Sequence, residues 1–585
     1  MKNKILITLL AISPLFSWNC TDLEEERLDE AEFGGQAEAV SGAIASAYGQ
    51  VSWTWRHTNY YGLQLIAADE AILPYRGGTD WFDGGKFLGV HAHNITPTND
   101  LVSSSWNELT TNISRTLAAI EVLTPLSEEG NTEATGALYE MRALRAYLNM
   151  LLLDSWGIVL KKESINELSE VLRTQEAIDY IESEFMEVVD VINTDRGSGR
   201  MTQSAVWGFL ARLHLNAPVW RDPYGSPDFT AADMDKAIAF SDNVINSGLY
   251  SLSPEYFELF NDENRDNPEL IFALDQRGVL RREHSRWAYW PIAGSMFPRP
   301  EFPSADGTDG PAITSDFYQT WVDAYGAVDP AEADSRFYQK NTLVPDAQLQ
   351  DLEDREPLLE TETENSFYCV VPEEFEMDRG ILRGIQWGPR KGDDGEFFTC
   401  DGGQVQIFPI QQRKGNGPER DIGYVNHTLD VNFTIEGSLH NTGYRPSKYQ
   451  FSRTSDNGNN FSSVDLVLMR LAEVYLMRAE AKLRKGDDGG ALADVNTVRT
   501  SRTARPDQTP EALAAVDLDI LFRERGFELY WEGFRRTDQI RFGKYEDSWT
   551  DKTDTDVNKR LFPIPQSAVD GASGVEGFLV QNPGY

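Results

Sequence analysis

The sequence predicts a mainly α-helical protein in which antiparallel helical pairs flank a loop-rich region with a few short strands. Two helical pairs and one irregular stretch lead to this prediction. In residues 461–502, apolar side chains recur at spacings of three and four, and KGDDGG then separates this helix from a second one. Residues 202–248 repeat the arrangement, with alanines on both limbs that let two helices approach closely. Residues 255–460 are instead rich in Gly, Pro, Asp and aromatic residues.

The inner face of the 461–502 pair is predicted to be apolar. The residues that we place on it are Leu468, Leu471, Ala472, Tyr475, Ala479 and Leu483, followed by Ala491, Val495 and Val498 in the second helix. Arginines and glutamates alternate along the other side, which predicts a solvated outer face without chemistry. We therefore interpret this pair as scaffold and expect the function to lie in loops.

The other elements follow in chain order. Residues 33–50, 103–123 and 138–157 have a helical period, whereas the aromatic stretch after residue 50 is interrupted by Pro74 and two Gly-Gly pairs. The runs QVQIFPI and DVNFTI alternate as short strands do. ILFRERGFELYWEGFRRTDQIRFGKY predicts one further helix, and the proline-bounded tail is expected to lie over the surface.

The N-terminus has the pattern of an export signal. MKNK is basic, and ILITLLAISPLF is apolar but too short to span a bilayer as a stable helix. Trp18 and Asn19 suit ordinary signal cleavage badly, so we expect Cys20 to be lipidated, although both residues are also loose for a lipobox. An acidic run, TDLEEERLDE, follows Cys20. The mature protein is then anchored to a membrane and not threaded through it.

Charge and composition exclude some function classes. The 585 residues include 53 Lys and Arg against 93 Asp and Glu, which gives a net charge of −40. Such a field repels phosphate backbones, so nucleic acid is not an expected partner. The chain has only three cysteines, too few for a disulfide scaffold or a cysteine-rich zinc fold.

In their order along the chain, several segments resemble the SusD/RagB family of outer-membrane nutrient-binding lipoproteins. The segments that carry the resemblance are LYEMRALRAYLNMLLLDSWG, GRMTQSAVWGFLARLHL, AIAFSDNVINSGLYSL with FELFNDENRDNPELIFAL, RLAEVYLMRAEAKLRKGD, FRERGFELYWEGFRRTDQIRFGKY, and the stretch from PIP to QNPGY. The resemblance covers nearly the whole mature chain, and no single segment is decisive.

This resemblance implies a body of tetratricopeptide-like helical pairs with a looped glycan-binding subdomain. It also implies a cell-surface protein, lipid-anchored in the outer membrane, that captures oligosaccharide or polysaccharide and delivers it to a SusC-like TonB-dependent transporter. The expected parts are a lipoprotein signal peptide (1–19), an acidic surface tether (20–32), N-terminal helical pairs with an aromatic loop (33–254), an irregular glycan-binding insert (255–460), and a C-terminal helical pair with a surface tail (461–585).

Trp81 and Arg76 form the first candidate for glycan binding. Trp81 lies in RGGTDWFDGG, where flanking glycines favour an exposed loop and an indole plate for a sugar face. Arg76 can donate several hydrogen bonds to hydroxyl groups. An Asp-Glu pair, then Arg, then Trp is also similar to the family pattern. The alternative is that Trp81 fixes the loop to the protein body.

Trp287, Tyr289 and Trp290, in RREHSRWAYWPIAG, form the second candidate. In an extended run, Trp287 and Tyr289 would share one face. The neighbouring Arg281, Arg282 and Arg286 make this the one obvious basic cluster, which leaves acidic sugars open although the net charge favours a neutral polysaccharide. Core packing is the alternative for these rings.

Cofactors are not expected. His91 and His93 are two residues apart but have no evident third ligand, so we predict no metal site there. Calcium at the Asp-rich residues 306–310 stays open. Once Cys20 is lipidated, Cys369 and Cys400 are the only other cysteines, and export gives them an oxidising setting in which to form a disulfide.

We predict that the protein is not an enzyme. A glycosidase needs two apposed carboxylates, but 93 acidic residues always offer some pair, and no serine nucleophile elbow or HExxH motif occurs. A surface glycoside hydrolase and a structural lipoprotein that uses its helical repeats for protein contacts remain the alternatives.

Overall fold

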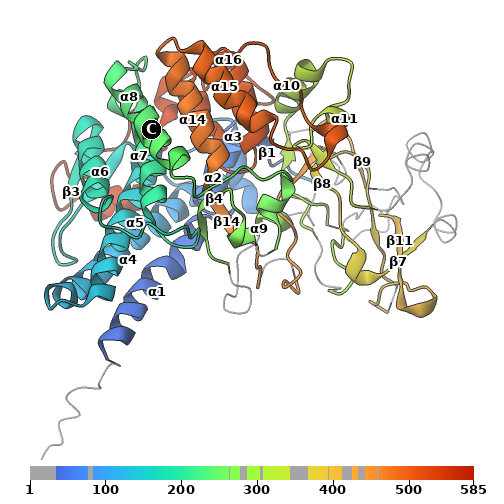
Figure 1. Cartoon of the computed structure of the whole chain (residues 1–585), viewed down its shortest axis with the longest axis horizontal. Helices are drawn as coiled ribbons and strands as arrows, with labels where there is room; N and C mark the ends of the chain where they lie inside the picture. Colours follow the sequence, from blue (N-terminus) through green and yellow to red (C-terminus); the bar gives the residue numbers. More distant parts are fainter. Residues whose placement is uncertain are drawn as a thin grey trace, which may run out of the picture.

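The computed structural model describes residues 35–76, 83–262, 264–276, 286–294, 296–302, 307–342, 367–392, 394–410, 425–431, 442–457 and 460–585. Its larger part is a body of helices that pack side by side (Figure 1). These helices are α1 (Gln36–Thr54), α4 (Asp100–Glu128), α5 (Thr132–Trp156), α6 (Thr174–Val188), α7 (Gln203–Arg221), α8 (Ala231–Asn246), α14 (Leu471–Arg484), α15 (Asp488–Arg499) and α16 (Leu518–Leu529). The predicted helical class is confirmed.

The helical pairs follow one another through the body. Each of α4 to α8 packs against the next, and α8 packs against α14 although the insert separates them in sequence. The turns between these helices lie at the polar and glycine residues, as the sequence predicted. Thr202 and Thr230 cap α7 and α8 by accepting backbone N–H bonds, and Gly157 ends α5 in the left-handed region, with φ 69°. The two predicted pairs therefore form one continuous stack.

The C-terminal segment predicted as one helix is two helices. The first, α16, ends at Leu529, and α17 (Arg535–Arg541) follows after a turn. Trp531 has φ 59° and Gly533 has φ 80°, and neither value fits a right-handed helix. The apolar period continues across the turn, which is why periodicity alone joined the two.

Another difference concerns the start of the 461–502 pair. Residues Leu466–Arg470 form strand β14, which pairs antiparallel with β4 (Leu270–Leu274), so Leu468 lies in a strand and α14 begins only at Leu471. Both strands are buried along their whole length. A strand that is buried on both faces has no alternation, and it therefore reads like the start of a buried helix.

The insert between α8 and β14 contains short strands, as the sequence predicted, and the structure pairs them into small antiparallel sheets. Its strands are β5 (Ala312–Ile313), β6 (Tyr338–Gln339), β7 (Tyr368–Val370), β8 (Arg379–Leu382), β9 (Gly384–Ile385), β10 (Trp387–Pro389), β11 (Val405–Pro409), β12 (Asn426–His427) and β13 (Arg445–Ser447). QVQIFPI contains β11, whereas most of DVNFTI lies outside the described residues. In Figure 1 the sheet of β7 and β11 lies at the end of the molecule opposite α4 to α6.

The charged face of the 461–502 pair is not solvated, which corrects the sequence-based prediction. Arg470, Arg502 and the α16 residue Glu528 have side chains that are at most 1% exposed. Arg470 Nη1 donates to Glu528 Oε1 at 2.7 Å, and Arg502 Nη2 donates to the same oxygen at 2.5 Å. Buried charges are tolerated when they are paired in this way.

The buried network also holds the insert to the helical body. From the insert, Arg336 Nη1 donates to Glu528 Oε2 at 3.3 Å, and Lys448 Nζ donates to Glu532 Oε1 at 2.6 Å. Burial lowers the pKa of Lys448 to about 8. The charged residues of the C-terminal helices therefore connect parts of the chain that lie far apart in sequence.

None of the helices in the described part of the chain combines the length and the apolar character needed to cross a membrane. Cys20 and the tether lie outside the described residues, as do residues 343–366, an acidic stretch that precedes β7.

Candidate functional site

Arg76 fixes the segment that leads into the predicted binding loop. The segment begins with β1 (Ala71–Ile72), which pairs antiparallel with β5 of the insert. Arg76 is only 3% exposed, and it donates from Nη1 to Thr442 O at 2.7 Å and from Nε to Gly310 O at 3.2 Å. The guanidinium therefore ties residues 71–76 to two segments of the insert, and in this conformation it faces backbone carbonyls.

A second arginine contacts the same two carbonyls. Arg445 is fully buried and donates from Nη1 to Gly310 O at 2.7 Å and from Nη2 to Thr442 O at 3.2 Å. Burial lowers its pKa to about 10. Gly443, next to Thr442, lets this segment pass close to Ala312 of β5. A Cβ at Gly443 would lie 2.4 Å from Ala312 Cβ, and the φ of Gly443 is 83°. Sequence reasoning missed Arg445, since no local pattern marks a buried arginine.

The Asp-Glu pair before Arg76 anchors the same segment to the C-terminal helices. Asp69 accepts two hydrogen bonds from Arg535, at 2.7 and 2.8 Å. Glu70 is fully buried, and its Oε1 accepts the Trp531 backbone N–H at 2.6 Å. Burial raises the pKa of Glu70 to about 8. This pair is therefore structural support beneath the candidate site.

The raised pKa of Glu70 predicts a specific pH dependence. Between about pH 4.5 and pH 8 the folded state holds a proton that the unfolded state releases, so the free energy of unfolding falls as pH rises through this window. Glu70→Gln cannot ionise and should remove this slope, an effect on the order of 3 kcal/mol across the window. Urea unfolding at pH 5, 6, 7 and 8 measures it, with the exposed Glu38→Gln as control. Parallel curves for Glu70→Gln and wild type would contradict the prediction.

Trp287 and Trp290 are core residues, which corrects their assignment to a glycan-binding surface. Both are 0% exposed, and the Trp287 ring stacks on Tyr61 with centroids 3.6 Å apart. The run is not extended, because Arg286–Tyr289 form the short helix α9. Indoles with no exposed surface offer no plate to a sugar. Apolar residues in a charged, loop-like stretch do not reveal from sequence alone that the stretch is buried.

Tyr289 is the one ring of this trio that is partly exposed. It packs edge-to-face on Phe451 with centroids 6.4 Å apart. Trp81, Arg281 and Arg282 lie outside the described residues. Of the five predicted glycan-binding residues, Arg76 and Tyr289 therefore remain candidates in the described part of the chain. Trp81 stays a prediction.

The two histidines make backbone contacts. His91 Nε2 lies 2.6 Å from Thr550 O, and His93 Nε2 lies 3.1 Å from Ala67 O. Burial lowers the pKa of both, which favours neutral rings. Asp309, from the segment considered for calcium, accepts the Gly294 N–H at 2.8 Å. Among the described residues no cluster of three or more His, Cys, Asp or Glu could hold a metal ion.

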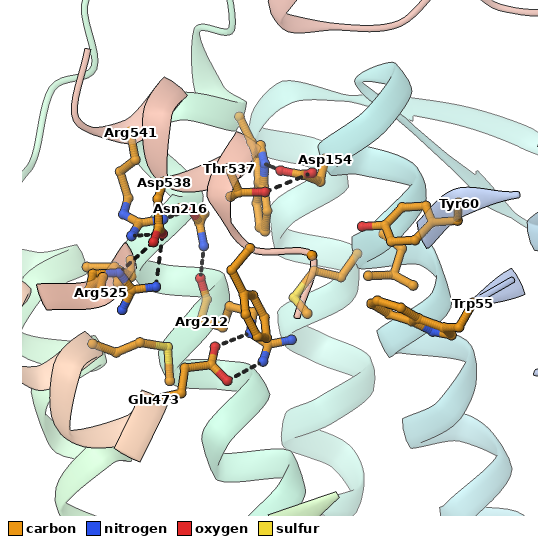
Figure 2. Close-up of a pocket in the computed structure, with 17 residues that line it drawn as sticks. Trp55, Tyr60, Asp154, Arg212, Asn216, Glu473, Arg525, Thr537, Asp538 and Arg541 are labelled. Atoms are coloured by element: carbon orange, nitrogen blue, oxygen red, sulfur yellow. Dashed lines mark hydrogen bonds and ion pairs between the residues drawn. The ribbon is translucent and has the colours of Figure 1, made fainter. Parts of the chain in front are cut away.

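A cavity of about 40 Å³ lies inside the helical body (Figure 2). Trp55 and Tyr60 lie on one side of it, and on the other side are two ion pairs, Arg212 with Glu473 and Arg525 with Asp538. A volume this small holds a few waters and is far below the roughly 300–1,000 Å³ of a typical ligand pocket.

Asp538 of this cavity does not resemble the general acid of a glycosidase. Burial raises the pKa of Asp538, but Arg525 and Arg541 outweigh burial and hold it below its usual range. A general acid needs a raised pKa, so this arrangement is the opposite of what glycoside hydrolysis requires.

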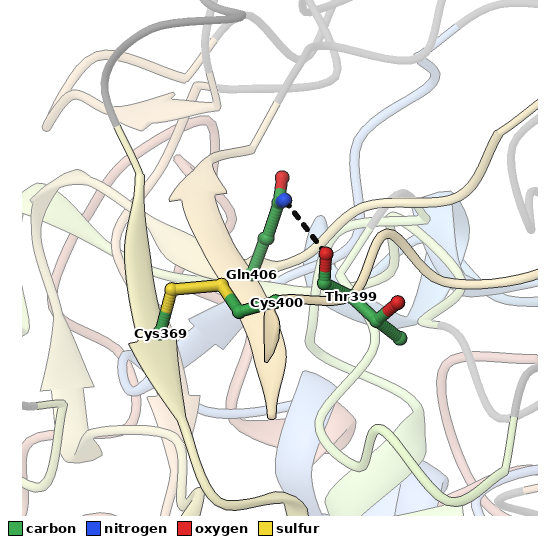
Figure 3. The surroundings of a disulfide bond; sticks show 4 residues. All are labelled: Cys369, Thr399, Cys400 and Gln406. Carbon is green, nitrogen blue, oxygen red and sulfur yellow. Dashed lines mark hydrogen bonds between the residues drawn. A yellow bond between two sulfur atoms is a disulfide. The ribbon is translucent and has the colours of Figure 1, made fainter. Parts of the chain in front are cut away.

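The insert contains an aromatic cluster that the sequence reasoning did not identify. Phe367 and Phe398 are 37% and 40% exposed, and both pack on Phe408 of β11. Each exposed ring lies two residues before a cysteine, and the structure joins those cysteines, Cys369 and Cys400, in a disulfide (Figure 3). In the sequence, the signal for this cluster was a phenylalanine two residues before each of these two cysteines, because residues two apart in a strand lie on the same face.

The amino-acid sequence is similar to those of known proteins. The chain is 28% identical to the starch-binding protein SusD of Bacteroides thetaiotaomicron over 466 residues, which cover 76% of this chain and 72% of that protein. It is 24% identical over 287 residues to a SusD-like protein of Bacteroides ovatus, covering 47% of this chain and 50% of that one.

Solved structures share the fold. A laminarin-binding SusD-like protein superposes with a TM-score of 0.62 at 17% identity, covering 93% of this chain and 99% of its own. The surface glycan-binding protein A of Bacteroides thetaiotaomicron, solved with laminarihexaose, gives a TM-score of 0.60 at 17% identity, with the same coverage. The names of these two proteins and of the starch-binding relative describe binding, in agreement with the prediction that the chain is not an enzyme.

The model of the SusD family matches residues 218–585, which contain the insert and the C-terminal helices α14 to α17. The helical stack and the order of its segments agree with this match. The chain belongs to the SusD family.

Proposed function

We propose that this protein captures a neutral oligosaccharide or polysaccharide at the cell surface and delivers it to a SusC-like TonB-dependent transporter. The relationship to a starch-binding SusD protein is the observation that carries the proposal. The net charge of −40 favours a neutral glycan over an acidic one.

The binding edge that we propose consists of the loop with Trp81, the segment ending at Arg76, and Tyr289. Arg76 and Arg445 share two carbonyl acceptors, so the base of the loop is held in place before ligand arrives. A base fixed in advance lowers the entropy lost on binding.

Affinity electrophoresis tests the proposal. The protein from residue 21 onward is run through gels that contain amylopectin, laminarin, xylan or polygalacturonate, with bovine serum albumin as the unretarded standard. Retardation by a neutral polysaccharide without release of reducing sugar is expected. Release of reducing sugar would favour a hydrolase, and no retardation in any gel would favour a structural lipoprotein.

The proposed lipid anchor gives a separate prediction. Cys20→Ala should remove incorporation of labelled palmitate and leave the protein unprocessed or released, since Cys20 would carry the lipid. Labelling in cells, followed by immunoprecipitation, measures the effect, and Cys20→Ser serves as a second variant. Equal labelling of the alanine variant and the wild type would contradict the anchor.

A further inference from the structure

The sheet β10–β11–β7 of the insert has one buried face and one aromatic outer face. Val370, Val405 and Ile407 are at most 7% exposed and belong to the core. Side chains alternate between the faces of a strand, so Cys369, Gln406 and Phe408 lie on the other face. The outer face of an antiparallel sheet is usually polar, and a group of phenylalanines there needs an explanation.

Three rings form the centre of this outer face. Phe408 has its centroid 5.5 Å from that of Phe367 and 6.0 Å from that of Phe398. The Arg390 guanidinium lies 5.8 Å from both the Phe398 and the Phe408 centroids. We call Phe367, Phe398, Phe408 and Arg390 the phenylalanine platform. Phe367 and Phe398 are its exposed rings, whereas Phe408 is only 3% exposed and lies beneath them. The guanidinium of Arg390 adds a group that can donate several hydrogen bonds.

The platform is held rigidly by covalent and hydrogen bonds. The disulfide joins β7, which follows Phe367, to the segment that carries Phe398, with Cα atoms 6.1 Å apart. Gln406 N donates to Phe398 O at 2.9 Å, and Gln406 Nε2 donates to Thr399 O at 2.9 Å (Figure 3). The two exposed rings are therefore fixed relative to each other without a ligand, as is typical of a preorganised site.

The size of the platform indicates what it binds. Two phenylalanines of about 200 Å² each, exposed by 37% and 40%, present roughly 150 Å² of apolar surface. A stable protein interface buries about 800 Å² on each partner, so this area is too small for one. One or two sugar rings, each with an apolar face and a rim of hydroxyl groups, match both the area and the nearby donors.

The charges around the platform indicate the class of sugar. Asp394, Glu396 and Asp401 are exposed in the turns beside Phe398 and Cys400. In the described part of these turns, the cations Arg390 and Lys391 both lie over aromatic rings. Acidic groups at the rim disfavour a uronate or a sulfated sugar. The favoured ligand is a neutral glycan.

We propose that the phenylalanine platform is a second carbohydrate subsite, which contacts a neutral polysaccharide at a place separate from β1 and the segment that ends at Arg76 (Figure 1). This inference rests on the proposed glycan-binding function. A long chain that reaches both places gains affinity from the second contact through its high effective concentration, whereas a short oligosaccharide does not. The platform therefore adds affinity for polymers.

Affinity electrophoresis with the polysaccharide that retards the wild type tests this inference. The Phe367→Ala/Phe398→Ala variant should bind the polymer at least about tenfold more weakly and should bind a short oligosaccharide of the same sugar unchanged. Phe398→Tyr keeps the ring and should bind like the wild type, while Phe398→Leu keeps only an apolar group and should be weaker. Leu168→Ala, which removes another exposed apolar side chain, is the matched control.

The outcomes separate this inference from the proposed function. Equal retardation of the double variant and the wild type would overturn the platform and leave the proposed function intact. A Phe398→Leu variant that binds like wild type would also overturn it, because stacking on a ring would then be unnecessary. A wild type that no polysaccharide retards would overturn both. Near-ultraviolet circular dichroism shows that each variant is folded before its binding is compared.

Discussion

Replacing Glu528 with alanine is expected to lower the free energy of unfolding by about 3–5 kcal/mol. The carboxylate is fully buried and accepts hydrogen bonds from Arg470, Arg502 and Arg336. Without it, three guanidinium groups lose a shared counter-charge in a site where water does not replace it. Because Arg336 belongs to the insert, hydrogen exchange in β6 and β8 should increase together with the loss of stability.

The pH dependence of this effect follows from the pKa of Glu528. Burial raises that pKa, but Arg502, Arg470 and Arg336 outweigh burial and hold it well below the usual range. The carboxylate therefore contributes stability above about pH 4.5, and this contribution is lost as pH falls towards the folded-state pKa. Glu528→Gln should consequently lose less stability than the wild type during acid titration.

Urea unfolding of wild type, Glu528→Ala and Glu528→Gln at pH 7 and below pH 4.5 measures both effects. Glu258→Ala is the matched control, since Glu258 is exposed. Ordinary surface substitutions change the free energy of unfolding by about 0.5 kcal/mol. If the free energies of unfolding of Glu528→Ala and the control differ by less than about 1 kcal/mol, the network adds little stability.

Trp81→Ala is expected to abolish detectable glycan binding and to leave the thermal melt nearly unchanged. A sugar face on an indole buries about 100 Å² of apolar surface, worth about 2.5 kcal/mol, and association costs at least about 4 kcal/mol. A few such contacts with hydrogen bonds give a Kd in the micromolar to millimolar range, so the loss of one plate takes binding below detection. Weak affinity would also suit the proposed release of the ligand to a transporter.

Affinity electrophoresis and thermal melting of the same samples check this prediction. Trp207→Ala is the matched control, because Trp207 is a partly exposed tryptophan on α7 of the helical body. A sharp fall in the melting temperature with binding retained would instead make Trp81 a structural residue, and the binding site would lie elsewhere.

The elements that the sequence determined are those whose signals are local. A period of 3.6 with polar turns predicted α7 with α8 and α14 with α15, because an apolar face and a capping residue suffice to form such a pair. The order of segments along the chain identified the family, since it reflects the whole stack. The short strands of the insert followed from alternation in runs such as QVQIFPI.

Only the tertiary structure decided which side chains are exposed. Trp287 and Trp290 resembled binding plates in sequence, but Tyr61 and Trp531, which lie far away along the chain, cover them. Arg470 belonged to a face predicted to be solvated, and it is buried because it pairs with Glu528 of α16, which supplies its counter-charge. Burial depends on contacts between distant segments, and a local pattern holds no information about those contacts. For the same reason, Phe367 and Phe398 became a candidate site only when the fold left them uncovered.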